Sequence, residues 1–201
     1  MGFYLSLAAV SDATIDRLVA DPPLVMQIML PGDPNAVASA RERPPGPGLF
    51  GRLLGRKAPP PPPEPPPLAL RPGEGDLGPE GNFEKSWHGF HYLLTGTAWE
   101  GDLPLNFLLV GGRELDIEIG MAPPRAYSVA ETRVIADALA RLDDAELRRR
   151  YSPAEMMRLE IYPEVWEGPG EVDRLLEDMT GLRAALERVT RQGFGLLVMI
   201  N

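Results

Sequence analysis

The side chains best suited to chemistry near neutral pH are the two histidines, His88 and His91, which lie three residues apart in the chain. Imidazole has an ordinary pKa of about 6.5, so it can serve as a general acid, a general base or a metal ligand. In a helix, a spacing of three places both rings on neighbouring surface positions. The surrounding segment, Trp87 to Gly96, is therefore the first candidate for a functional site.

The sequence leaves three uses for the two imidazoles open. In the first, His91 is a structural residue that hydrogen-bonds to a carbonyl or carboxylate within an apolar stripe, and His88 lies at the helix edge. In the second, the pair binds a ligand without metal or acts as a general base. In the third, Glu84 or Glu160 completes a metal site. We expect the first use, with no metal and no cofactor. The ligand-binding candidates are Trp87, His88, His91, Tyr92, Thr95, Glu160 and Tyr162.

Composition excludes several classes of protein. The chain has no cysteine, which removes thiol nucleophiles, zinc-thiolate sites and disulfides and is compatible with a cytoplasmic location. No serine lies in a G-x-S-x-G elbow, and there is no Walker loop or H-E-x-x-H motif. A net charge of -9 argues against nucleic acid as a partner. No apolar run is long enough for an integral membrane segment.

Apolar periodicity predicts the helix that carries the two histidines, over residues 82–94. Asn82 suits its N-cap, and Gly96 suits its end because glycine tolerates the left-handed backbone. The buried stripe of this helix is predicted to consist of Phe83, Trp87, Phe90, His91 and Leu94.

The segments at the two ends of the chain, 3–10 and 194–200, are almost wholly apolar and predict strands covered on both faces. We therefore expect a mixed α/β fold, with one sheet in which the N- and C-terminal strands are central and several helices pack against it. Helices are predicted over 11–20, 24–30, 128–141, 143–150, 152–160 and 171–192. Residues 105–110 fit a short helix or a strand, and 114–119 fit a half-exposed strand or an extended loop.

Residues 31–80 differ from the rest of the chain, since they contain 15 of the 23 prolines and 8 of the 21 glycines. This composition predicts a disordered insert within a single domain formed by residues 1–30 and 81–201. The tract 59–67 favours polyproline II, which can dock onto a protein partner. A G-x-G-x-x-G match at 46–51 follows no strand, so it does not indicate a dinucleotide site. Residues 49–57 combine leucines with a basic edge, as in a linker segment or a docking motif.

Four segments together resemble a known family. The run 87–97, then 105–112, 160–166 and the C-terminal helix leading into 195–198 are similar, in this order, to the YfbM-like family, bacterial proteins grouped as a domain of unknown function. The resemblance implies a single cytosolic mixed α/β domain and brings no assigned catalytic residues. The favoured function is a non-enzymatic binding or protein-interaction module. The alternative is a small, hydrolase-like enzyme with a His88/His91 pocket.

Overall fold

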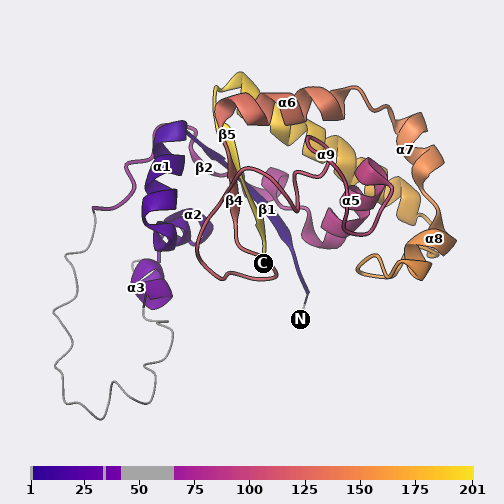
Figure 1. Cartoon of the computed structure of the whole chain (residues 1–201), viewed down its shortest axis with the longest axis horizontal. Helices are drawn as coiled ribbons and strands as arrows, with labels where there is room; N and C mark the ends of the chain where they lie inside the picture. The colour runs from indigo at the N-terminus through magenta and orange to yellow at the C-terminus, as the bar shows by residue number, and fades with distance from the viewer. Residues whose placement is uncertain (1, 34, 42–65) are drawn as a thin grey trace, which may run out of the picture.

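The computed structural model describes residues 2–33, 35–41 and 66–201. These residues form a five-stranded sheet with helices on both faces (Figure 1). The strand order is β2 (Gly75–Asp76), β1 (Leu5–Val10), β5 (Gly195–Ile200), β4 (Arg125–Tyr127) and β3 (Arg113–Glu114). Neighbouring strands are antiparallel throughout this order. The prediction that the first and last strands of the chain are central is therefore confirmed.

The central strands are apolar on both sides because each side meets a different layer of helices. Successive side chains of a strand point to opposite faces. Leu196 and Val198 of β5 thus belong to one buried cluster, and Leu197 and Met199 belong to the other. A strand of this kind cannot alternate polar with apolar residues, which explains why both terminal segments are continuous apolar runs.

The helices divide between the two faces of the sheet (Figure 1). One face carries α1 (Asp12–Ala20), the 3-10 turn η1 (Pro22–Val25) and α2 (Met26–Met29), with α3 (Ala36–Arg41) beside them. The other face carries the larger set, namely α5 (Trp87–Thr95), α6 (Val129–Ala140), α7 (Asp144–Arg150), α8 (Pro153–Arg158) and α9 (Glu171–Arg191). Within the described ranges, no helix is long and apolar enough to cross a membrane.

Both flanks of the segment predicted as an insert pack onto the fold. Helix α3 contacts η1 and α2, and strand β2 pairs with β1. The Glu74 carboxylate accepts hydrogen bonds from the Ser11 N–H and the Thr14 hydroxyl at the start of α1. The proline- and glycine-rich composition concealed these contacts, which are made by the Glu74 carboxylate, by the pairing of β2 and by a few apolar side chains such as Ala36, Val37 and Leu68. Residues 42–65 lie outside the described part, and so do the G-x-G-x-x-G match, the 49–57 segment and most of the polyproline tract.

Helix α5 is shorter and more deeply buried than its apolar stripe predicts. It begins at Trp87, not at Asn82, because Glu84 has a φ of 43° and interrupts the helical path. A 3-10 turn, η3 (Glu84–Ser86), precedes it, and η2 (Gly78–Gly81) comes before that. Asn82 accepts a hydrogen bond from the Glu84 N–H and is not the N-cap of α5. Every residue from 87 to 94 is buried, and Gly96 ends the helix with a φ of 78°, as predicted.

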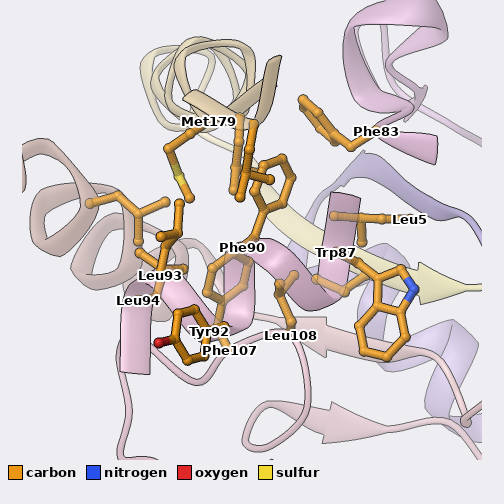
Figure 2. Close-up of a cluster of buried hydrophobic side chains, with 14 of the residues drawn as sticks. Leu5, Phe83, Trp87, Phe90, Tyr92, Leu93, Leu94, Phe107, Leu108 and Met179 are labelled. Carbon is orange, nitrogen blue, oxygen red and sulfur yellow. The ribbon is translucent and has the colours of Figure 1, made fainter. Parts of the chain in front are cut away.

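The apolar side chains of α5 pack between the sheet and α9. Figure 2 shows Phe90 and Leu93 turned toward Met179 of α9, with Trp87 beside Leu5 of β1. A Cβ at Gly89 would come within 2.5 Å of the Trp166 ring, so only glycine allows this close approach. Trp87, which is 1% exposed, is therefore part of the core.

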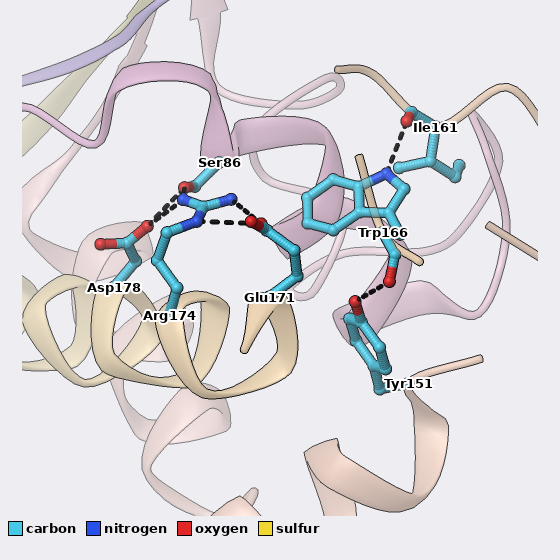
Figure 3. A network of polar contacts seen from close by, with 7 residues as sticks. All are labelled: Ser86, Tyr151, Ile161, Trp166, Glu171, Arg174 and Asp178. Carbon is cyan, nitrogen blue, oxygen red and sulfur yellow. Dashed lines mark hydrogen bonds and ion pairs between the residues drawn. The ribbon is translucent and has the colours of Figure 1, made fainter. Parts of the chain in front are cut away.

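Polar contacts fix both ends of α5. At its start, Ser86 donates a hydrogen bond to Asp178 and accepts one from Arg174, both on α9 (Figure 3). At its end, Arg150 donates to the carbonyls of Leu93 and Leu94, which have no partner within the helix. Arg148 and Arg149 form ion pairs with Asp173 and Glu146, so the whole Arg148–Arg150 run makes structural contacts, as expected for cations at the C-terminal end of a helix.

Several local predictions are confirmed and others are wrong. The capping box of Ser128 and Glu131 opens α6. Helical spacing places Val19 on the apolar side of the helix predicted over 11–20 and Val134 on that of the helix predicted over 128–141, but these two side chains are 42% and 58% exposed. Residues 105–110 form successive turns and neither a regular helix nor a strand. Of 114–119 only Glu114 belongs to a strand, and the rest is irregular, which agrees with the extended-loop alternative. Helical spacing identifies the apolar side of an amphipathic helix, but neighbouring helices decide how wide a stripe they cover.

Candidate functional site

His88 joins two loops that are far apart in the sequence. Its Nδ1 accepts a hydrogen bond from the Tyr162 N–H at 3.0 Å, so Nε2 carries the proton and donates to the Ala98 carbonyl at 2.8 Å. The ring is 1% exposed. Burial lowers the pKa of His88, and the hydrogen bond to Ala98 opposes this shift only in part. The imidazole is therefore neutral at pH 7, with both nitrogens occupied.

We call residues 97–104 and 160–167 the loop pair. In the first loop, the Thr97 hydroxyl donates to the Glu100 carbonyl at 2.6 Å. In the second, the Trp166 indole N–H donates to the Ile161 carbonyl at 2.6 Å, and the Trp166 carbonyl accepts from the Tyr151 hydroxyl (Figure 3). Each loop thus has stabilising hydrogen bonds of its own, in addition to the connection through His88.

An aromatic stack extends from the core to the loop pair. The Trp87 and His88 rings are parallel, with centroids 4.7 Å apart and an interplanar angle of 6°. Trp99 lies 4.4 Å from His88, and Tyr162 lies 6.1 Å from Trp87. Phe3 contacts the edge of Tyr162, and its N–H donates to the Tyr162 hydroxyl at 3.2 Å. Buried rings therefore support the exposed ones.

The loop pair presents apolar side chains to solvent. Trp99 is 53% exposed and Leu103 is 51% exposed on the first loop, and Val165 is 43% exposed on the second. The five carboxylates of these residues are exposed too, and none of them forms an ion pair with another part of the chain that the structure describes. They are Glu100, Asp102, Glu160, Glu164 and Glu167.

His91 lies deeper than His88 and is fully buried. Its Nε2 is 3.3 Å from the Thr95 hydroxyl, which donates to the His91 carbonyl and can therefore accept from the ring. Nδ1 has no hydrogen-bond partner among the described residues. Burial and the neighbouring His88 lower the pKa of His91 to about 4, although Glu100 acts in the opposite direction. His91 is thus a neutral residue of the interior.

The structure brings some of the predicted site residues together and separates others. Trp87, His88 and Tyr162 share the aromatic stack, and His91 lies 6.3 Å from His88, ring to ring. The charged groups that act on the Tyr92 hydroxyl are Glu155 and Arg158 of α8, not the two histidines. Burial, followed by Glu155, raises the pKa of Tyr92, and Arg158 opposes this shift.

Glu160 is exposed at the start of the second loop, with a φ of 54°. This left-handed backbone is unfavourable for a residue other than glycine. Neither Glu160 nor Glu84 completes a metal site with the histidines, since the described ranges contain no group of three potential metal ligands close enough to hold an ion.

A hollow of about 60 Å³ lies away from the histidines, against the sheet face covered by α2. Its lining comes from Ser6, Ala8, Ile28, Met29, Met199 and Asn201. These residues belong to β1, α2 and the end of the chain, and none of them was a predicted site residue.

Trp99 is the site residue that sequence reasoning missed. The residue types that suggest chemistry are the histidines, and Trp99 has no catalytic group. A signal was present, because Trp99 is the only large apolar residue between Thr95 and Asp102, in a segment with a glycine at each end. A tryptophan in such a polar loop lacks the apolar neighbours that would bury it.

Comparisons with known proteins agree with this fold. No curated protein matches the sequence significantly. Among solved structures, the chain is similar to the crystal structure of a protein of unknown function, YfbM from Escherichia coli, with a TM-score of 0.60 and 22% sequence identity over 99% of each chain. An identity this low supports the fold alone. The family model described as a domain of unknown function, DUF1877, matches residues 1–199. The chain therefore belongs to the DUF1877 family.

Proposed function

We propose that this domain is a non-enzymatic binding module and that the loop pair is its contact surface for a protein partner. The observation that carries this proposal is the half-exposed Trp99 ring, held against a buried histidine whose two nitrogens fix both loops. Tryptophan is strongly enriched among residues that dominate binding energy at protein interfaces. A preorganised tryptophan loses little entropy on binding, so the loop pair suits recognition.

Three features of the histidines favour binding over the hydrolase-like alternative. A general base needs a ring nitrogen within reach of the proton that it removes. Both nitrogens of His88 already have backbone partners. His91 is fully buried, and its pKa of about 4 makes it a weak base. The arrangement therefore supports a role in positioning the loops.

A selection experiment tests the proposed function. A random peptide library displayed on phage is enriched on the immobilised full-length domain, and the enriched peptides are then measured against two variants. Trp99→Ala removes the exposed ring, and we expect binding to weaken about tenfold or more. Val134→Ala is the matched control, because Val134 is 58% exposed on α6 and outside the loop pair. Equal binding to both variants would contradict the proposal.

The proline-rich tract is a second proposed contact with a protein partner. Residues 59–67 contain eight prolines and one glutamate, a composition that favours the extended polyproline II conformation. Such segments bind aromatic grooves of partner domains at a low entropic cost. Deleting residues 42–65 removes most of this tract and leaves the loop-pair residues unchanged. Affinity capture of partners with the full chain and with the deletion variant therefore separates the contact made by the tract from that made by the loop pair.

A further inference from the structure

We infer that the partner segment bound by the loop pair is basic and inserts a lysine or arginine side chain beside Trp99. This inference rests on the proposed function and adds the chemistry of the partner. It combines two independent features of the surface, namely an exposed tryptophan ring and an uncompensated set of carboxylates.

The first feature is the charge of the loop pair. Residues 97–104 and 160–167 contain five acidic residues and no basic residue. Several half-buried carboxylates elsewhere in the fold have arginine partners one helical turn away, as in Glu146 with Arg149 and Glu155 with Arg158. On the loop pair no such partner exists among the described residues. His88 holds both loops side by side, which keeps these like charges close together.

The second feature is the exposed Trp99 ring on the first of the two loops. A cation over an indole face is attracted by the ring quadrupole, and tryptophan is the best of the aromatic side chains for this contact. Glu100 follows Trp99 directly and acts electrostatically on His91, so its negative charge lies near the stack that carries Trp99. One cation of the chain, Lys85, lies at the other end of the stack, where its side chain and the Tyr162 hydroxyl both adjoin Gly2.

The same charge distribution selects among basic and acidic partners. Phosphate-rich surfaces such as nucleic acids and anionic lipids would be repelled by the unpaired carboxylates of the loop pair. A peptide segment that carries lysine or arginine next to apolar residues fits both Trp99 and its exposed neighbours Leu103 and Val165. Electrostatic complementarity of this kind also predicts binding that weakens as salt increases.

Collisional quenching of tryptophan fluorescence tests the electrostatic part directly on the free, full-length protein. Trp87 and Trp166 are each 1% exposed, so an ionic quencher reaches chiefly Trp99. The Stern–Volmer constant of each quencher is divided by its value for N-acetyltryptophanamide at equal ionic strength. We expect this ratio to be at least about twofold larger for caesium than for iodide. In the double variant Glu100→Gln/Glu160→Gln this preference should fall measurably, although three of the five carboxylates remain. Glu118→Gln/Asp137→Asn, which removes the same charge elsewhere, should retain it.

The phage selection provides the binding test. We expect peptides enriched on the wild type to be rich in arginine and lysine, and to lose about tenfold or more in affinity for Glu100→Gln/Glu160→Gln but not for the control variant. Enriched peptides that are neutral or acidic, yet depend on Trp99, would overturn this inference and leave the proposed function intact. The absence of any Trp99-dependent peptide would overturn both.

Discussion

The two hydrogen bonds of the His88 ring lead to a prediction about the stability of three variants. His88→Phe keeps an aromatic ring against Trp87 but removes both polar contacts, leaving the Tyr162 N–H and the Ala98 carbonyl without their partner. Leaving a buried polar group unpaired costs about 1–3 kcal/mol. Both contacts are only partly buried, so we take the lower half of this range for each. The expected loss of unfolding free energy for His88→Phe is therefore about 2–4 kcal/mol.

Two further variants divide this loss between the loops. The side-chain amide of glutamine can occupy the position of Nε2, so His88→Gln keeps the donor to Ala98 and loses the acceptor for Tyr162. Asparagine places its oxygen near the position of Nδ1, so His88→Asn keeps the contact with Tyr162 and loses that with Ala98. Each variant should lose about half as much stability as His88→Phe, because each breaks one hydrogen bond.

Urea unfolding followed by circular dichroism at pH 7.5 measures these differences, and tryptophan emission reports on Trp99. In all three variants we expect the emission to shift to longer wavelength, because the first loop is no longer fixed to the second. The account of His88 as a bridge between two loops is refuted if His88→Phe unfolds at the same urea concentration as the wild type. It is also refuted if His88→Phe is no less stable than His88→Gln and His88→Asn.

Three other predictions follow from individual groups. The pKa of His91 falls from 6.5 in the unfolded chain to about 4 in the fold, so the unfolded chain binds the proton more tightly. The contribution of neutral His91 to the unfolding free energy is therefore fully present above about pH 6.5, and roughly 3 kcal/mol of it is lost as the pH falls toward 4. Urea titrations at several pH values should show a smaller loss for His91→Gln than for the wild type. Burial raises the pKa of Glu74, but hydrogen bonds from the Arg71 backbone, Ser11 and Thr14 lower it by more. Its stabilising effect is therefore present above about pH 4.5 and lost below, and Glu74→Gln should flatten the acid end of the stability curve. Finally, the left-handed backbone of Glu160 predicts that Glu160→Val lowers the melting temperature and Glu160→Gly does not, as differential scanning calorimetry would show.

Sequence alone determined the elements whose signals are local. The apolar segments 3–10 and 194–200 have no alternation, which is sufficient to predict strands covered on both faces. The capping box of Ser128 and the glycine at position 96 mark helix ends through hydrogen bonds and backbone geometry within a few residues. The long apolar stripe of α9 predicted the helix that covers α5. The resemblance of four ordered segments to the YfbM-like family predicted the family.

Tertiary structure decided what the histidines do and where the exposed surface lies. His88 has partners 10 and 74 residues away, and no local pattern can indicate a hydrogen bond to a backbone atom at such a separation. Trp99 became a site residue only because folding placed it against His88, while about half of its surface stays exposed to solvent. Periodicity records which side of an element is apolar, but long-range packing selects the groups that meet. The two imidazoles therefore suggested chemistry in the sequence, and burial turned them into the support of a surface formed by other residues.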